Sequence, residues 1–265
     1  MLRHRTLALI ALLITACVDE PIAWNPTRGV AVAIRPGTRL VMEGNGLPRL
    51  VEDDVPRITL GSGACPSSIV GTAAAGGERY AAWFVERADG SVMLVVARSS
   101  DAGATWSAPV VAEDRDRGTR ACDRPPPAIS ADTGNNYVHL AYYIEPREGA
   151  GVWYTHSMER GMIWHQTIGI LYGEDPVHTS VASAADTVLV AYEHPGSGNR
   201  RIGLAISREA GHTFDERLRV VHATGTVHDP RVAISDGVVA LAWSEDGEAS
   251  DSSVSGTRVR MGRFR

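Results

Sequence analysis

Short, largely apolar segments recur along the chain, and each ends in alanine followed by a large aromatic residue. They are Tyr80–Trp83, Val138–Tyr142, Val188–Tyr192 and Val239–Trp243, and Ala23-Trp24 lies one further step back. The aromatic residues are 50 to 59 positions apart. Turn-forming residues separate apolar segments of this length in all-β proteins. Beyond the N-terminal leader, no segment has the 3.6-residue period of a long amphipathic helix. The chain is therefore predicted to be all-β.

A hairpin motif of the form Ser-x-acid-x-Gly, followed by an aromatic residue, occurs three times. Its positions are Ser99, Asp101, Gly103 and Trp106, then Ser157, Glu159, Gly161 and Trp164, then Ser207, Glu209, Gly211 and Phe214. A short acidic side chain can accept backbone N–H groups inside a tight turn, and glycine can adopt the positive φ that such a turn requires. The motif resembles the Asp-box, or BNR repeat, of the sialidase-like β-propellers. In that family the box lies opposite the ligand face, so it indicates architecture and not activity.

A third feature precedes each repeat: a cysteine or an aspartate close to a proline. The examples are Cys65-Pro66, Cys122-Asp123-Arg124-Pro125, Asp175-Pro176 and Asp229-Pro230. Three independent features with one period of about 50 residues indicate a radially repeated all-β fold. In the first full repeat we expect four strands, at 68–72, 79–86, 91–98 and 108–112. The predicted fold is thus a sialidase-like β-propeller with four-stranded blades.

The number of blades depends on the two ends of the chain. The first copy, residues 22–60, has no recognisable inner strand or intact box, and the last stops before an outer strand. Each can complete the other, which removes a free sheet edge. Five blades are favoured; four blades with an N-terminal extension, or six as in true sialidases, are the alternatives. Residues 17–265 are expected to form this single domain with a short N-terminal tether.

The first 16 residues are predicted to be a lipoprotein signal peptide. A basic start, Met1–Arg5, precedes the apolar run Leu7–Ile14 and the small residues before Cys17. This order is typical of a secretory signal, and the run is too short for a stable transmembrane helix. Ile14–Cys17 also resembles a bacterial lipobox, in which Cys17 is lipidated. The expected protein is a membrane-anchored lipoprotein of the bacterial cell envelope, periplasmic or surface-exposed; the alternative is an ordinary signal peptide with an incidental cysteine.

Two cysteines remain in the exported chain, Cys65 and Cys122. Both lie in the segment that precedes the first strand of a repeat, in two successive repeats. An exported protein folds in an oxidising compartment, where a disulfide can form. We expect a disulfide between them, the alternative being two buried thiols.

Candidate binding residues cluster in the connections that enter the inner strands. In propellers of this family these connections share one face with the loops between the second and third strands, around the central channel. The predicted channel-mouth set is Asp123, Arg124, Asp175, His178, His228, Asp229 and Arg231. An aspartate before a proline can also simply cap a turn. No His or Cys spacing matches a known metal motif, so neither a metal nor a cofactor is predicted.

The remaining features bear on the class of function. The net charge of −5, without a Lys/Arg cluster, gives no indication of nucleic-acid binding. The family resemblance implies, for an active sialidase, three arginines that clamp a carboxylate, a Tyr–Glu nucleophile pair and an acidic acid/base residue. Here only Arg124 and Arg231 can be placed, and no Tyr–Glu pair can be assigned, although Tyr142, Tyr143 and Glu145 are close in sequence.

The leading hypothesis is therefore a propeller that binds a glycan or protein ligand at the channel mouth without established catalysis. One alternative is a divergent exo-sialidase-type glycoside hydrolase. The other is a structural partner in an envelope complex, which predicts an exposed apolar patch on the rim.

Overall fold

The computed structural model describes residues 20–132, 134–194, 201–220, 225–247 and 256–265. The predicted signal peptide, residues 1–16, and the predicted lipidation site Cys17 lie outside these ranges. Within the ranges, no helix has the length and the apolar character that a bilayer span requires.

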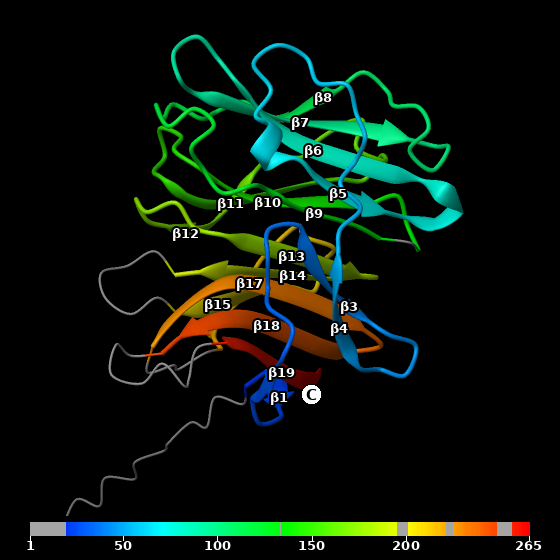
Figure 1. Cartoon of the computed structure of the whole chain (residues 1–265), viewed down its shortest axis with the longest axis vertical. Coiled ribbons are helices and arrows are strands. Elements are labelled where there is room, and N and C mark those ends of the chain that lie inside the picture. Colours follow the sequence, from blue (N-terminus) through cyan, green and yellow to red (C-terminus); the bar gives the residue numbers. More distant parts are fainter. Residues whose placement is uncertain (1–19, 133, 195–200, 221–224, 248–255) are drawn as a thin grey trace, which may run out of the picture.

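The strands form successive antiparallel sheets that follow one another in chain order (Figure 1). The first four-stranded sheet contains β5 (Val70–Ala73), β6 (Arg79–Glu86), β7 (Val92–Ser99) and β8 (Val110–Glu113). The second contains β9 (Ala128–Ala131), β10 (Val138–Ile144), β11 (Gly151–Ser157) and β12 (Ile168–Tyr172). The third contains β13 (Thr179–Ala184), β14 (Thr187–Glu193), β15 (Ile202–Ser207) and β16 (Glu216–Arg219). Two short 3₁₀ helices, η1 (Pro66–Ser68) and η2 (Ala75–Gly77), flank β5.

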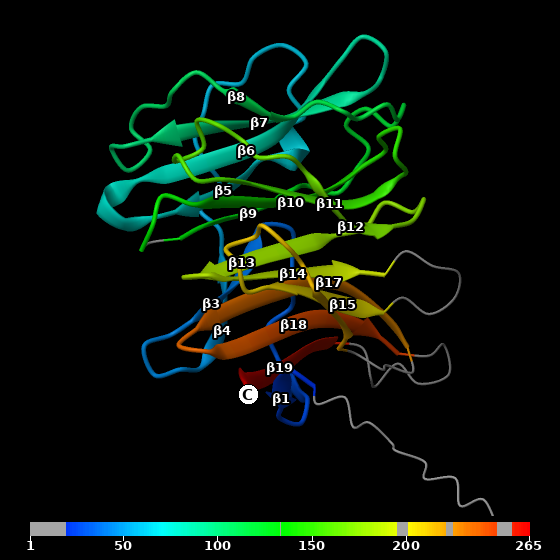
Figure 2. The same ribbon diagram turned by 180° about the vertical axis from the view of Figure 1, so that it is seen from behind.

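The last sheet combines both ends of the chain. It contains β17 (Thr226–Ser235), β18 (Val238–Asp246) and β19 (Gly256–Phe264), and β1 (Ile22–Trp24) and β2 (Arg28–Val30) both pair with β19. Figure 2 shows β1 beside β19. In this pairing Ile22 is opposite Phe264 and Trp24 is opposite Gly262. The expectation that the incomplete first and last copies complete one another is confirmed. The alignment of Ala23-Trp24 with the second strand of a repeat is wrong, because β1 is an outer strand of this sheet.

A two-stranded hairpin makes the fifth sheet. It consists of β3 (Thr38–Met42) and β4 (Pro48–Glu52). Thus residues 22–60 do contain an inner strand, β3, which the sequence did not reveal because no box hairpin or complete blade accompanies it. The all-β propeller prediction is confirmed, with three four-stranded sheets, one five-stranded sheet and one hairpin among the described residues.

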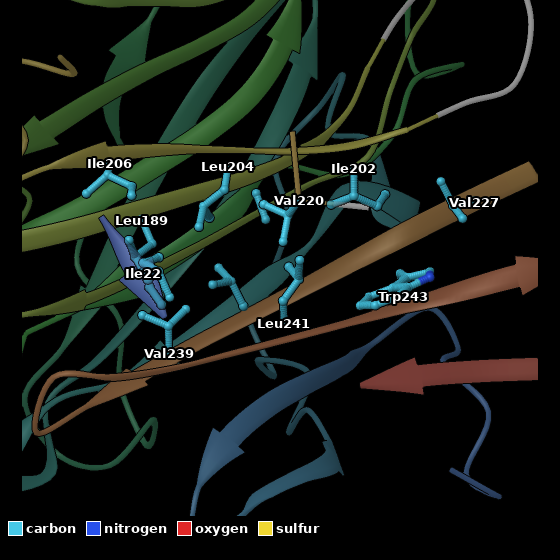
Figure 3. Close-up of a cluster of buried hydrophobic side chains, with 13 residues drawn as sticks. Ile22, Leu189, Ile202, Leu204, Ile206, Val220, Val227, Val239, Leu241 and Trp243 are labelled. Carbon is cyan, nitrogen blue, oxygen red and sulfur yellow. The ribbon is translucent and has the colours of Figure 1, made fainter. Parts of the chain in front are cut away.

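The core consists of apolar layers between neighbouring sheets, since the second strands of the four larger sheets bury residues on both faces. Figure 3 shows the layer between the third and last sheets, where Leu189 and Leu204 face Leu241 and Trp243. All four aromatic residues that end the repeated segments are buried: Trp83, Tyr142, Tyr192 and Trp243. Each repeat of the sequence therefore corresponds to one sheet, and its aromatic residue is buried in an apolar layer beside that sheet.

The three predicted box hairpins share one hydrogen-bond pattern. The hydroxyl oxygens of Ser99, Ser157 and Ser207 accept the N–H groups of the motif glycines at 2.8, 3.0 and 2.9 Å. The motif glycines Gly103, Gly161 and Gly211 all have positive φ. We expected the acid to accept backbone N–H groups of the turn. Among the described contacts only Asp101 does so, by accepting the N–H of Thr105 at 2.9 Å, and the serine is the acceptor common to all three turns.

The aromatic residue that follows each motif packs back onto the core. Phe214 meets Tyr154 of the preceding sheet with ring centroids 4.8 Å apart, and Trp164 packs on the layer between the first two four-stranded sheets. These contacts agree with the predicted packing between adjacent sheets.

Candidate functional site

A central cavity of about 980 Å³ is lined by the inner strands β3, β5, β9, β13 and β17. Hydroxyl groups are frequent on its wall, from Ser67, Thr72, Ser130, Ser180 and Ser183. Because all five sheets contribute, the cavity is the place where residues from distant parts of the sequence meet. Propeller axes and sheet switch points are common positions for ligand sites.

The structure brings five of the seven predicted mouth residues to this cavity: Asp123, Arg124, His178, Asp229 and Arg231. Asp175 is exposed and does not line it. His228 also does not line it; its Nε2 lies 3.3 Å from Asp246 Oδ2.

The disulfide between Cys65 and Cys122 joins two entry loops at the same cavity. The Cα atoms are 5.3 Å apart, Cys65 is buried, and Cys122 lies on the cavity wall. This bond ties the connection before β5 to the connection before β9.

An acid–imidazole cluster occupies one part of the cavity wall. His178 and Asp229 line the cavity, and the fully buried Glu193 lies behind them. His178 Nδ1 is 3.2 Å from Glu193 Oε1 and 3.5 Å from Asp229 Oδ1. The N–H of Asp229 donates to Glu193 Oε1 at 2.8 Å. Glu193 therefore links the three residues by hydrogen bonds, through the His178 ring and the Asp229 backbone.

A β-bulge positions Asp229 in this cluster. The register between β17 and β18 shifts between His228 and Arg231, and Asp229 adopts a φ of 54°. Aspartate is one of the few residues other than glycine that tolerate this conformation. The bulge turns the Asp229 N–H toward Glu193 and its carboxylate toward both histidines.

His228 extends the cluster toward β18. Its Nδ1 is 2.8 Å from Asp229 Oδ2. Burial alone favours the neutral imidazole, but the hydrogen bonds and charges of Asp229 and Asp246 raise the pKa of His228 above its usual value. The carboxylate of Asp229 thus lies between two imidazoles, with His178 near Oδ1 and His228 near Oδ2.

Asp53 is a cavity residue that the sequence analysis missed. Burial raises the pKa of Asp53 to about 6, although the guanidinium groups of Arg39 and Arg231 lower it. Arg39 Nε lies 2.8 Å from Asp53 Oδ1. A carboxyl group that titrates near neutral pH inside a cavity is a typical feature of functional sites. Asp53 belongs to the atypical first copy, so the repeat pattern did not point to it.

The two predicted arginines are held by the protein itself. Arg231 donates to the carbonyl oxygens of Thr38 at 2.6 Å, Pro230 at 2.9 Å and Arg35 at 3.4 Å. The Arg124 guanidinium is fully buried and pairs with the fully buried Asp116, Nη2 to Oδ2 at 3.2 Å. Arg124 therefore anchors the connection before β9. As a correction to the sequence analysis, its guanidinium binds Asp116 and is not placed to clamp a ligand.

Glu193 was also missed, although the sequence contains a signal for it. An acid follows each repeated aromatic residue within three positions: Glu86, Glu145, Glu193 and Glu245. These residues lie at or next to the ends of the second strands, on the face that carries the loops between the second and third strands of each sheet, which we call the loop face. Glu145 forms a second polar cluster there, with Arg120 Nε at 2.9 Å and the Tyr143 hydroxyl at 3.5 Å.

The cluster of His178, Glu193 and Asp229 could also hold a cation, since its potential ligand atoms lie within 4.8 Å of one another. Its members already satisfy one another by hydrogen bonds, so the geometry does not require an ion.

The fold and the cavity define the chain as an all-β propeller with a polar, acid- and imidazole-bearing central cavity. No protein-family model matches the sequence, and no curated protein matches it either. Among solved structures, the Hadza microbial sialidase Hz136 is similar, with a TM-score of 0.50 and 17% identity over 68% of this chain and 42% of that one. This likeness shows a sialidase-like fold.

Two further structures are similar at lower scores. A Trypanosoma rangeli sialidase in complex with 2,3-difluorosialic acid has a TM-score of 0.48 and 15% identity, covering 85% of this chain and 40% of its own. A protein described as a glycoside hydrolase has a TM-score of 0.45 and 11% identity, covering 82% and 75%. The chain spans less than half the length of the two sialidases.

Proposed function

We propose that the chain binds a carbohydrate in its central cavity, at the wall formed by His178 and Asp229. The observation that carries this proposal is the acid–imidazole cluster backed by the buried Glu193. Sugar hydroxyls donate and accept hydrogen bonds, and the cluster offers both roles at fixed positions. The likeness in fold to a microbial sialidase adds support for a carbohydrate ligand.

The cavity favours recognition by hydrogen bonds over ring stacking. No tryptophan, tyrosine or phenylalanine lines it among the described residues. Aromatic platforms are the usual means of binding the apolar face of a sugar. We therefore expect a highly polar saccharide with many free hydroxyls.

Glycan-array screening followed by calorimetry with the best ligand tests this proposal. His178→Gln and Asp229→Asn each remove part of the cluster, and Asp175→Asn is a matched control at an exposed residue outside the cavity. The two cluster variants should bind at least about tenfold more weakly, since a hydrogen bond that involves a charged group contributes about 1.5–3 kcal/mol. Equal affinities in all three variants, or no glycan bound by the wild type, would contradict the proposal.

The second candidate is a divergent glycoside hydrolase, favoured by the raised pKa of Asp53. A general acid must carry its proton near the working pH, and burial holds the pKa of Asp53 at about 6. Asp229, which lines the same cavity, supplies a second carboxylate. Glycosidases commonly use one carboxyl group as the acid and another as the nucleophile or base.

A panel of fluorogenic sialosides and other glycosides tests this candidate. The rate should fall above about pH 6 as Asp53 loses its proton. Asp53→Asn should abolish the activity, whereas Asp54→Asn, next to it and exposed, should retain it. An unchanged rate in Asp53→Asn rules out Asp53 as the acid.

We also propose that the protein is exported and anchored at Cys17 in the bacterial envelope. The disulfide between Cys65 and Cys122 supports export, since such bonds persist in oxidising compartments. Cell fractionation checks the anchor: Cys17→Ser should release the protein from the membrane fraction. A wild-type protein that is already soluble would exclude lipid anchoring.

A further inference from the structure

Three histidines from two neighbouring sheets converge at the end of the molecule opposite the loop face. β11 runs from the loop face, where Gly151 pairs with Ile144, to the opposite end, where Ser157 pairs with Val138. His156 precedes that end, His165 lies in the connection from β11 to β12, and His212 lies in the hairpin between β15 and β16. One potential ligand nitrogen of each lies within 4.8 Å of the others.

His156 is the buried member of this group, and its polar atoms lack partners. Its residue is 2% exposed, and neither Nδ1 nor Nε2 has a hydrogen-bond partner among the described residues. Buried polar atoms are nearly always satisfied, so a nitrogen of this kind indicates an ion or a water molecule at the site. The imidazole of His165 stacks on it with centroids 4.5 Å apart, and that of His212 meets it edge-on at 4.7 Å.

The other two histidines are exposed. Hydrogen bonds hold the ring of His212 and the backbone of His165. His212 Nδ1 lies 2.7 Å from the Glu209 carbonyl oxygen, which requires a proton on Nδ1 and leaves Nε2 with its lone pair. Metal-bound histidines commonly show this arrangement. The N–H of His165 donates to the His156 carbonyl oxygen at 2.9 Å, and the His165 carbonyl accepts from Thr155 Oγ1 at 2.8 Å.

Two aromatic rings flank the buried imidazole of His156 on its inner side, those of His139 and Tyr137. Behind it, His139 Nδ1 is 2.7 Å from the Tyr154 hydroxyl, so His139 is turned toward a different partner. Tyr137 stacks on His156 at 5.8 Å and covers one side of the site.

We propose that His156, His165 and His212 bind one divalent transition-metal ion of the class that prefers imidazole, with Zn²⁺ as the reference ion. Three neutral imidazoles are a typical zinc ligand set, and they also suit Cu²⁺ and Ni²⁺. A tetrahedral ion with bonds of about 2.0–2.1 Å needs ligand nitrogens about 3.3 Å apart. A change in the rotamer of the exposed His165 ring, whose backbone alone is held, together with small shifts of the other two rings, would bring the nitrogens to this spacing from within 4.8 Å of one another.

The site leaves at least one coordination position open to solvent, because His165 and His212 are exposed. Zinc sites with three protein ligands and one open position bind water or an external ligand there. This site is separate from the central cavity, since none of its three histidines lines that cavity. The two proposals can therefore fail independently.

Calorimetric titration of the purified, EDTA-treated chain with ZnCl₂ in a non-chelating buffer tests the proposal. The expected result is saturation at one Zn²⁺ per chain. His165→Gln and His212→Gln change exposed residues, so both variants should fold, and each should weaken binding at least about tenfold, the lower end of the loss seen even for outer-shell partners. His178→Gln is the matched control, because His178 belongs to the other cluster that could hold a cation.

Substitution with Co²⁺ gives a second readout. A tetrahedral Co²⁺ site with histidine ligands absorbs in the visible range. This absorption should vanish in His165→Gln and His212→Gln, while the far-UV circular dichroism of both variants stays unchanged. Absence of saturable Zn²⁺ binding overturns the proposal. Binding that survives His165→Gln and His212→Gln but is lost in His178→Gln also overturns it and assigns the ion to the cavity cluster.

Discussion

The backbone N–H of Asp229 donates a hydrogen bond of 2.8 Å to Oε1 of Glu193 across the boundary between the third and last sheets. Glu193 is fully buried, so its replacement leaves this N–H without an acceptor. We expect Glu193→Ala to lower the free energy of unfolding by about 1–3 kcal/mol, the usual cost of an unsatisfied buried donor. Urea denaturation measures it, with the exposed Glu174→Ala as the control. A loss equal to that of the control would contradict this role.

The buried ion pair of Arg124 and Asp116 gives a larger expected effect. Arg124→Met leaves the Asp116 carboxylate buried without its cation, which typically costs about 3–5 kcal/mol. Arg147→Met at an exposed position controls for the loss of an arginine and should change stability by less than about 0.5 kcal/mol. Comparable values for the two variants in chemical denaturation would show that Arg124 is not an anchor.

The disulfide closes a long loop, since Cys65 and Cys122 are 57 positions apart in the sequence. Chain-entropy arguments give a stabilisation of about 4 kcal/mol for a loop of this length. The double variant Cys65→Ala/Cys122→Ala should therefore unfold at lower temperature than the wild type. Reductant should lower the wild-type melting temperature and leave that of the double variant unchanged; an effect on both would point to another cause.

Two turn glycines with the same backbone conformation should respond differently to alanine. Gly161 and Gly211 both have positive φ, so each alanine carries the cost of about 1–2 kcal/mol for a left-handed residue. At Gly211 a Cβ would overlap the Tyr154 hydroxyl, whereas at Gly161 the nearest atom is 3.7 Å away. Gly211→Ala should thus be the less stable variant in thermal unfolding. Equal melting temperatures would mean that Tyr154 moves without cost.

Asp53 should make the free energy of unfolding fall as the pH rises, which is the reverse of the usual effect of a carboxyl group. Its pKa is about 6 in the folded chain against a reference of 3.8, so the folded state holds its proton more tightly. Stability relative to Asp53→Asn is then greatest at about pH 4 and falls by up to about 3 kcal/mol as the pH rises through 6. Urea denaturation at several pH values measures this difference. Asp54→Asn should show the opposite slope, since the hydrogen bond from Arg79 lowers the pKa of Asp54.

Much of the architecture could be predicted because repetition makes three weak signals agree. The strand predicted at 79–86 is β6, and the aromatic residues that end the repeated segments, such as Tyr142 and Trp243, are buried between sheets. The two errors, at Ala23-Trp24 and at β3, both lie in the first copy. There β1 pairs with β19 in the last sheet, and β3 forms only a hairpin with β4. The local sequence pattern therefore does not show which strand each segment pairs with.

The candidate site was predicted less completely, because sequence position shows which loop a residue occupies but not which way its side chain points. Arg124 is at the cavity, yet its guanidinium turns into a buried pair with Asp116. Asp53 and Glu193 become relevant only through burial and through contacts across sheets. His156, His165 and His212 have no recognisable metal-binding spacing, since they meet only when two sheets are placed side by side.

The pairing of β1 with β19 also has a consequence for the order of folding. During synthesis β1 leaves the ribosome long before its partner β19 has been made. Until then Ile22 cannot reach its place in the layer shown in Figure 3, and the last sheet waits for its outer strand. Contacts this remote along the chain form slowly. Among the described strands, β1 is thus made first and reaches its final position late.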